Sequence, residues 1–438
     1  MSSLAAHRAR DVGPDPRTGA AARSILVIYS FPRLWSMGPG SGSPDFTHAL
    51  MALARAGNAT VLYPRARREW SSPTLTDEAP PGLRGIEFRD LRLPLMDASR
   101  GARVMRLAVI ALNLPLRMLN YLLFNLAAYG PARRVAAEVP PDLVTAHGTM
   151  GVWTASRIAA RTKAPLLVRL FGVSLGMWGF NPAMLLLGFE EALAFKARAA
   201  RWVIADDGSG GDAVARRMGA APERITMLRP AAHRRARSSA DDRGRYRERL
   251  GLTPDTLVVV RVCRLWRQQR IERLIEALPR ATRAGTPVAA VIIGDGPERE
   301  RLADLAKRLE KRVVFTGPVA NDLLPEHYLA ADLYAATGDR TNLGQSVLEA
   351  MCHGLPIVAI DCGETRALIR DGVNGRLVGS DPAALERALV ELLEDDETRQ
   401  RYGRAALDTA EREIADPARR VEIEAEVVAS LMPGRVAR

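Results

Sequence analysis

A glutamate near the start of a predicted helix is the residue best placed for chemistry. It stands in the stretch 339–365, DRTNLGQSVLEAMCHGLPIVAIDCGET, where an apolar run meets a glycine-containing loop and a helical pattern follows. Free N–H groups at such a helix N-terminus, together with the helix dipole, attract phosphate. Glu349, within about one turn of that N-terminus, could accept hydrogen bonds from sugar hydroxyls. A buried structural glutamate is the alternative, because strand–loop–helix segments are common.

Three arginines after another predicted strand form a second cluster. Residues 262–270 read VCRLWRQQR and contain Arg264, Arg267 and Arg270. An arginine presents a planar fork of donors where a lysine presents a point charge. For Arg264 alone, an ordinary surface arginine is the alternative.

The first half of the chain contains a glycine-rich loop, 38–44, and a histidine, His147, each after a predicted strand. The loop, which contains Gly42, could hold a phosphate or a sugar, or simply cross a sheet edge. For a lone histidine a structural role is the usual one. Asp206-Asp207-Gly208 follows a further strand and suits a turn.

Alternating apolar runs and helical patterns position these residues, and they predict parallel sheets. The predicted strands are 24–29, 60–63, 143–146, 166–170, 202–205, 257–263, 288–293, 313–315, 333–336 and 357–360. The predicted helices are 45–56, 153–161, 183–199, 271–284, 298–309, 323–330, 346–353 and a helical region from 383 to about 428.

The length of 438 residues suits two domains of roughly 200 residues each. We predict an α/β protein with two Rossmann-like, doubly wound domains that face each other across a cleft, where ligands bind at the carboxyl ends of strands. The segments would be a disordered tail (1–23), an N-terminal domain (24–232), a hydrophilic linker (233–247), a C-terminal domain (248–412) and a last helix (413–438) that could cross back to the N-terminal domain.

The stretch around Glu349 resembles the donor-site motif of family-four retaining glycosyltransferases, which have the GT-B fold. In that family a Glu-x7-Glu pattern precedes A-M-x-x-G-x-P-V-V-A, and Glu349-Ala-Met-Cys-His-Gly-Leu-Pro-Ile-Val-Ala359 matches its second half. Downstream, Gly363-Glu364 and Asp371-Gly-Val-Asn-Gly375 resemble the family's G-x-x-E-x-I-x-x-G-x-N-G run. The resemblance implies that Glu349 binds the ribose of a nucleotide-sugar donor held by the C-terminal domain, with the acceptor on the N-terminal domain.

Shorter matches occur in the family's order. Arg264 matches an arginine that neutralises the donor diphosphate, and Gly294 begins a turn that would let the base or ribose approach the backbone. Main-chain groups near Val319 would meet the nucleobase, and Tyr328 to Asp332 matches a structural helix-to-strand connection. His147 ends Asp142-Leu-Val-Thr-Ala-His147, which resembles a segment aimed at the donor sugar.

We therefore predict catalytic roles for His147, Arg264 and Glu349. The predicted donor contacts are Gly42, Arg267, Gln269, Arg270, Gly294, Val319, Thr341, Asn342, Leu343, Gly344, Gln345, Ser346 and Glu349.

Three positions depart from the family pattern. Thr341 stands where the first glutamate would be, although Asn342-Leu-Gly344 resembles a variant found in some members. Gln269 replaces a lysine and brings no charge, and Arg229-Pro-Ala-Ala-His233 replaces an Asn-Gly-Val-Asp segment. These departures put the contacts to the sugar and the diphosphate in doubt.

The resemblance implies transfer of a sugar from a nucleoside diphosphate to a hydroxyl acceptor, with retention, in the synthesis of a glycan, glycolipid or glycosylated metabolite. No Asp-x-Asp metal motif occurs, so we expect neither metal nor cofactor beyond the donor substrate. Two alternatives stay open: a degenerate, non-catalytic partner of an active transferase, and a sugar-nucleotide epimerase.

The net charge of +12 comes from 62 basic residues, of which only four are lysine. They are scattered, and no nucleic-acid-reading motif accompanies them. A composition bias, or attraction to a phosphorylated ligand or an anionic membrane, explains them. Three cysteines without framework spacing and the lack of a signal-peptide pattern favour a cytoplasmic location.

The apolar stretch 105–129 has two interpretations. It could form two buried or half-buried helices broken at Pro115, or an interfacial segment lying on the cytoplasmic face of a membrane.

Overall fold

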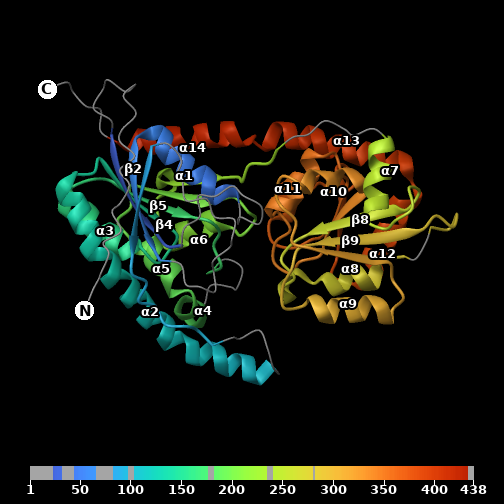
Figure 1. Cartoon of the computed structure of the whole chain (residues 1–438), viewed down its shortest axis with the longest axis horizontal. Helices are drawn as coiled ribbons and strands as arrows, with labels where there is room; N and C mark the ends of the chain where they lie inside the picture. The colour runs from blue at the N-terminus through green and yellow to red at the C-terminus, as the bar shows by residue number, and fades with distance from the viewer. Residues whose placement is uncertain are drawn as a thin grey trace, which may run out of the picture.

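Two parallel β-sheets organise the chain, one in each of two lobes that lie side by side (Figure 1). The computed structural model describes residues 23–31, 44–65, 82–96, 103–175, 182–233, 240–279 and 282–432. The N-terminal sheet has the order β3-β2-β1-β4-β5-β6-β7, and the C-terminal sheet has the order β10-β9-β8-β11-β12-β13.

The strands of the N-terminal sheet are β1 (Ser24–Tyr29), β2 (Asn58–Pro64), β3 (Leu83–Phe88), β4 (Leu143–His147), β5 (Leu166–Leu170), β6 (Arg201–Ala205) and β7 (Ile225–Leu228). Those of the C-terminal sheet are β8 (Leu257–Val262), β9 (Val288–Ile293), β10 (Val313–Gly317), β11 (Leu333–Ala336), β12 (Ile357–Ile360) and β13 (Gly375–Val378). Both orders are those of a doubly wound Rossmann sheet, so the predicted fold class is confirmed. The strand order reverses between β1 and β4 and between β8 and β11, and the carboxyl ends of strands at such points commonly bind ligands.

Helices cover both faces of each sheet, and a hydrophobic core lies on each face. In the N-terminal lobe they are α1 (Pro44–Ala56), α2 (Arg103–Glu138), α3 (Val152–Thr162), α4 (Pro182–Leu187), α5 (Phe189–Lys196) and α6 (Gly211–Arg217). In the C-terminal lobe they are α7 (Ala240–Arg249), α8 (Ile271–Ala277), α9 (Arg299–Arg308), α10 (Leu324–Ala330), α11 (Gln345–Cys352), α12 (Pro382–Glu394) and α13 (Asp396–Glu413). The last helix, α14 (Pro417–Leu431), returns to the N-terminal lobe and packs against α1 (Figure 1).

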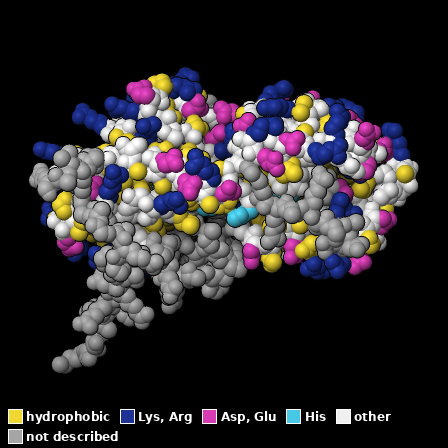
Figure 2. Space-filling view, turned by 90° about the horizontal axis from the view of Figure 1, so that it is seen from above, with side chains coloured by type: hydrophobic (Ala, Val, Ile, Leu, Met, Phe, Trp, Pro, Cys, Tyr) yellow, Lys and Arg dark blue, Asp and Glu magenta, His cyan; other side chains and the backbone are white. Residues whose placement is uncertain are grey.

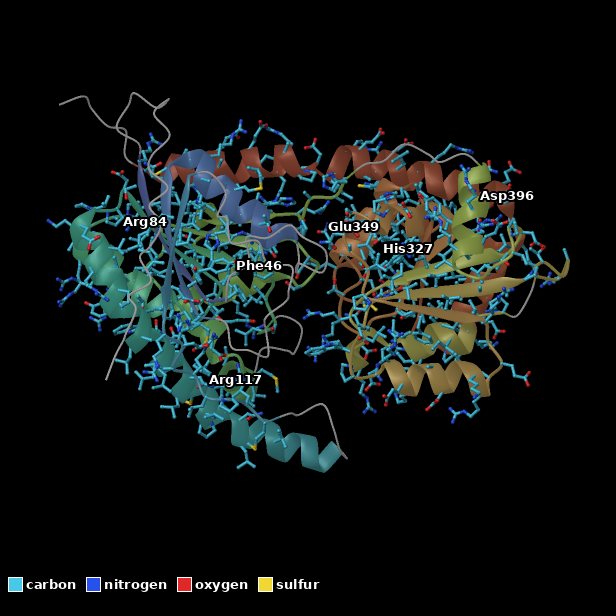
Figure 3. All side chains as sticks on the ribbon, viewed as in Figure 1. Phe46, Arg84, Arg117, His327, Glu349 and Asp396 are labelled. Carbon is cyan, nitrogen blue, oxygen red and sulfur yellow. The ribbon has the colours of Figure 1, made fainter. Side chains whose placement is uncertain are left out.

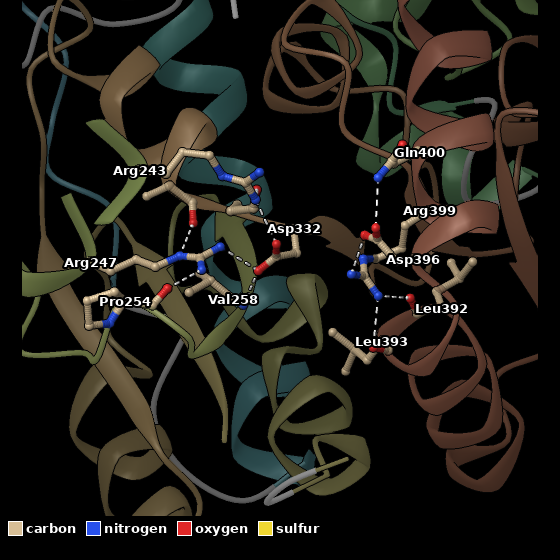
Figure 4. A network of polar contacts seen from close by, with 12 residues as sticks. Arg243, Arg247, Pro254, Val258, Asp332, Leu392, Leu393, Asp396, Arg399 and Gln400 are labelled. Atoms are coloured by element: carbon tan, nitrogen blue, oxygen red, sulfur yellow. Dashed lines mark hydrogen bonds and ion pairs between the residues drawn. The ribbon is translucent and has the colours of Figure 1, made fainter. Parts of the chain in front are cut away.

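Most of the second half of the predicted linker 233–247 is helical. Helix α7 packs against α10, and Arg243 and Arg247 pair with the two carboxylate oxygens of Asp332 at 2.7 and 2.8 Å (Figure 4). Asp332 also accepts a hydrogen bond from the N–H of Val258 at the start of β8. These contacts attach α7 to the C-terminal sheet.

Four buried charged side chains join α14 to the N-terminal lobe. Arg169 on β5 pairs with Asp45 at 2.6 Å and with Glu424 at 2.8 Å. Arg420 pairs with the same two carboxylates at 3.2 and 2.7 Å. All four residues are at most 3% exposed, so each charge depends on the others for compensation.

The prediction of a break at Pro115 is wrong. Helix α2 continues through both Pro115 and Pro131 over its 36 residues. Pro115 is exposed, so water can satisfy the backbone carbonyl that its ring leaves unpaired. In the residues that the structure describes, no helix is both long enough and apolar enough to cross a membrane.

Other boundaries differ for local reasons. The predicted helix 183–199 is divided at Gly188, where a Cβ would lie 2.6 Å from Leu175 Cδ2. The predicted helix 271–284 ends at Ala277, because Leu278 precedes a proline and is extended (ψ 120°). The helical region after 383 forms three helices, each begun by an aspartate cap at 381, 395 or 416. Strands β3, β7 and β13 were not predicted.

Candidate functional site

The carboxyl edge of the C-terminal sheet brings several predicted donor residues together. Arg264 follows β8, and Glu349 lies on α11, which follows the neighbouring strand β11. Glu349 lies on the side of the C-terminal lobe that faces the N-terminal lobe (Figure 3). The two segments are also joined directly, because Tyr334 of β11 donates to Val262 O and its hydroxyl contacts Ser346 Oγ at 2.7 Å.

Glu349 is held by two side chains of its own lobe. Its Oε2 accepts a hydrogen bond from Tyr328 at 2.7 Å and its Oε1 accepts one from Gln345 at 3.1 Å. Burial raises the pKa of Glu349, and the two hydrogen bonds only partly oppose the effect. Since each carboxylate oxygen can accept a further hydrogen bond, the fixed carboxylate retains capacity for hydroxyl donors.

The N-terminus of α11 has no side-chain cap. Gly344 occupies the N-cap position in an extended conformation, and a Cβ there would meet nothing within 4 Å. The first N–H groups of a helix need an acceptor from outside it. Gln345 and Ser346, the first residues of the helix, therefore border a position suited to an anion.

A buried arginine that the sequence analysis did not identify lies beside this position. Arg261, 4% exposed near the end of β8, donates to Tyr334 Oη at 3.0 Å and to Gln269 Oε1 at 2.6 Å. Within the described ranges no carboxylate pairs with it, and its Nε has no partner. Arginine stays charged in proteins, so Arg261 keeps an uncompensated positive charge two hydrogen bonds from the start of α11. Its place in the apolar run LVVVRV concealed it.

The three arginines of the predicted cluster differ in their partners. Arg264 is exposed and lies over the exposed Trp266, with 5.4 Å from Cζ to the ring centroid. Arg267 is exposed as well, and neither guanidinium pairs with an acid in the part of the chain that the structure describes. Arg270 pairs with Asp339, which also contacts Arg273 at 2.8 Å. The first two arginines are therefore available to an anionic ligand, and Arg270 is already paired.

Thr341, at the position of the missing glutamate, contacts the opposite lobe. Its hydroxyl donates to Asp207 O at 2.9 Å, and a Cβ on Gly208 would lie 2.3 Å from Thr341 Oγ1. Gln345 adds a second contact by donating to Ala231 O at 2.6 Å. The lobes thus touch at the edge that carries the predicted site.

Four other predicted donor residues have structural partners. Asn342 is 2% exposed, accepts from Gly338 N and donates to Ile360 O, while Leu343 is buried. Val319 packs against the core. At Gly294 (φ +122°) a Cβ would lie 2.0 Å from Cys263 O, so the close approach of two backbone segments requires glycine there, and the contact with a base or ribose stays a prediction.

His147 lies at the carboxyl end of β4 in an aromatic cluster. Its ring centroid is 5.9 Å from those of Tyr29 and Phe171, and the residue is 1% exposed. Burial lowers its pKa to about 3, so the imidazole is neutral. Its Nδ1 has no partner among the described residues. Its predicted contact with the sugar stays a prediction, and Gly42 lies outside the described residues.

Comparison with known proteins gives the family. A model of the glycosyl transferases group 1 matches residues 256–395, the part of the chain that carries Arg264, Glu349 and α11. A D-inositol 3-phosphate glycosyltransferase of Streptomyces bingchenggensis is 29% identical over 324 residues, which are 65% of this chain and 70% of that protein. Residues 256–395 of this chain are therefore similar to the glycosyl transferases group 1. The resemblance drawn from the motifs is confirmed.

Two further relatives of this glycosyltransferase are informative. A GDP-mannose-dependent α-(1-6)-phosphatidylinositol monomannoside mannosyltransferase of Mycolicibacterium smegmatis is 38% identical over 165 residues, 35% of this chain but only 43% of that protein. The structure of Anabaena HepE in complex with UDP-glucose has a TM-score of 0.64 at 20% identity and covers 92% of this chain and 99% of that chain. The fold is therefore shared over nearly the whole length, whereas sequence similarity to the mannosyltransferase covers less than half of that protein.

Proposed function

We propose that this glycosyltransferase moves a sugar from a nucleoside diphosphate sugar to a hydroxyl acceptor, with retention at the anomeric carbon. The observation that carries the proposal is the unpaired positive charge of Arg261, Arg264 and Arg267 beside the uncapped start of α11. As the sugar–phosphate bond breaks, negative charge grows on the departing diphosphate, and fixed positive groups stabilise it. Arg261 would supply the charge that Gln269 lacks, so no metal is needed in this scheme.

Other residues would hold the donor and exclude water. Glu349, fixed by Tyr328 and Gln345, would accept hydrogen bonds from the ribose hydroxyls. The contacts of Thr341 and Gln345 with the opposite lobe would keep water away from the anomeric carbon, since hydrolysis is the competing reaction. His147 would face the sugar as a neutral imidazole. We place the reaction in the cytoplasm, in the synthesis of a glycan, glycolipid or glycosylated metabolite.

A donor panel tests the proposal. UDP-sugars and GDP-sugars are the first probes, because similar proteins carry these nucleotides in their names or complexes. The melting temperature and nucleotide release of the full chain are measured with each donor. We expect Arg261→Met to weaken donor binding about tenfold or more, since a charged hydrogen bond contributes about 1.5–3 kcal/mol. Arg283→Met, in an exposed pair with Glu394, is the control.

Three outcomes would contradict parts of the proposal. Equal donor binding by Arg261→Met and wild type would remove Arg261 from the site. No melting shift and no nucleotide release with any donor would favour the non-catalytic partner. Conversion of the donor sugar without an acceptor would favour the epimerase.

A further inference from the structure

Nine of the seventeen large hydrophobic side chains that are exposed in the described residues belong to α2 and to the segment 91–96, which is hydrogen-bonded to α2. Five belong to α2, and they are Leu112, Met118, Leu119, Leu122 and Leu126, with exposures from 41% to 63%. Four belong to the adjacent segment 91–96, and they are Leu91, Leu93, Leu95 and Met96, with exposures from 38% to 50%. We call these nine residues the α2 face. A contiguous apolar surface of this kind marks an interaction site.

Two buried asparagines hold the segment 91–96 against α2. Asn120 accepts from Leu93 N at 2.6 Å and donates to Leu93 O at 2.9 Å. Asn113, seven residues earlier and thus on the same side of the helix, accepts from Met96 N and donates to Met96 O, both at 2.9 Å. These hydrogen bonds satisfy the backbone of the segment while its apolar side chains stay exposed. The segment 91–96 is therefore fixed to α2, and the α2 face is an ordered surface.

The sequence of side chains along α2 identifies the partner. The apolar residues end at Leu126, Tyr129 follows with its ring 5.8 Å from the 40% exposed Trp153, and the exposed Arg133 and Arg134 come next. Apolar, aromatic and cationic side chains thus occur together on this helix, which is the combination found in helices that lie in the interface of an anionic membrane. Arg157 also lies over the Trp153 ring at 5.2 Å.

The charge of α2 argues against a second copy of this chain as the partner. The helix carries five arginines and a single glutamate, the terminal Glu138. A two-fold contact along this helix would bring arginines together without acidic partners, whereas anionic lipid would neutralise them. Elsewhere, on the face seen in Figure 2, basic and acidic side chains are interspersed.

The α2 face is also connected to the catalytic edge of its lobe. Arg117 of α2 lines a cavity of about 270 Å³ together with Thr149, two residues beyond β4, and with Ser174 beyond β5. Glu190, on α5, pairs with Arg117, and Figure 3 shows Arg117 on α2 at the lower side of the lobe. A lipid headgroup beside Arg117 would thus lie next to this cavity.

We propose that the α2 face docks this glycosyltransferase on an anionic membrane surface. The helix lies in the interface with its leucines among the acyl chains and Arg133 and Arg134 among the headgroups. The proposal does not depend on the donor chemistry, because docking and donor binding involve different lobes. Each can fail without the other.

Vesicle co-sedimentation of the full chain tests the docking. We expect binding to phosphatidylcholine vesicles that contain phosphatidylglycerol, and about fivefold weaker binding for each of Arg133→Gln and Arg134→Gln. Leu122→Asp combined with Leu126→Asp should abolish sedimentation. Leu323→Asp is the matched control, since Leu323 is a 48% exposed leucine of the other lobe. All of these variants should keep the cooperative thermal unfolding of the wild type, which shows that they fold.

Several results would overturn the proposal. One is a wild-type protein that does not bind anionic vesicles. Another is a Leu122→Asp/Leu126→Asp variant that sediments with vesicles like wild type, and a third is an equal loss of vesicle binding in Leu323→Asp. Sedimentation velocity tests a fourth result. A wild-type dimer that dissociates in the double variant would assign the α2 face to a second copy of the chain.

Discussion

Replacing Glu424 with glutamine should destabilise the N-terminal lobe far more than an equally conservative change at a more exposed glutamate two residues away on α14. Glu424 is 2% exposed and pairs with both Arg169 and Arg420. Glu424→Gln leaves two buried guanidinium groups and only Asp45 to balance them. Removing one member of a buried ion pair costs about 3–5 kcal/mol. For a lobe of this size that corresponds to a fall in melting temperature of roughly 6–20 °C.

Glu422→Gln is the matched control. Glu422 pairs with Arg55 of α1 at 3.1 Å, so it joins the same two helices, but its side chain is 36% exposed and that of Arg55 is 60% exposed. An exposed pair contributes about 0–1 kcal/mol. The assay is thermal unfolding combined with limited proteolysis between α13 and α14. Similar shifts in the two variants would refute the claim that burial makes the Glu424 cluster the main attachment of α14.

The stability difference between wild type and Glu424→Gln should also change with pH in a defined direction. Burial acts to raise the pKa of Glu424, but Arg169 and Arg420 outweigh it, so the pKa lies below its usual value. The stability from this group is therefore complete above the pKa of an unfolded glutamate and is lost as the pH falls toward the folded pKa. The difference between wild type and Glu424→Gln should shrink on acidification. A difference that grows would contradict this assignment.

The remaining predictions concern the site between the lobes. Because burial raises the pKa of Glu349, the donor KM should begin to rise on acidification at a higher pH than for an ordinary glutamate. Glu349→Gln should remove this acidic rise from the pH profile of KM, and an unchanged rise would exclude Glu349 as its cause. Because burial lowers the pKa of His147 to about 3, NMR should show a neutral imidazole at physiological pH, and a midpoint near the ordinary histidine value of about 6.5 would mean that the ring is exposed. Gly208→Ala should lower kcat, because its Cβ would lie 2.3 Å from Thr341 Oγ1. Gly219→Ala, at φ +93° in open surroundings, should cost only about 1–2 kcal/mol of strain and leave kcat unchanged; equal kcat values would contradict the lobe contact.

Strong apolar strands made the architecture predictable from sequence. The runs at 24–29, 166–170, 288–293, 333–336 and 357–360 coincide with strands because they are buried on both faces of a parallel sheet. Strands β3, β7 and β13 were missed, since most of their residues are exposed or only partly buried and the strands do not appear as apolar runs. Helix α2 was misjudged at Pro115 because local rules do not include hydration of a freed carbonyl.

Only the residues of the candidate site that belong to sequence motifs could be predicted. Glu349 and Arg264 were found from spacing, and the fold brings them to the ends of adjacent strands. Tyr328, expected to be structural, donates directly to Glu349. Arg261 could not be recognised, because its importance depends on the absence of an acidic neighbour in three dimensions.

The return of α14 to the N-terminal lobe has a mechanical consequence. The chain passes between the lobes twice, once after β7 and once between α13 and α14, where Ala232 N donates to Ala415 O. A single connecting segment would let one lobe rotate in any direction relative to the other. Two neighbouring connecting segments act as a hinge. Opening of the site is thereby restricted to rotation about an axis near 232 and 415. Such a rotation would have to break the contact between Thr341 and Asp207.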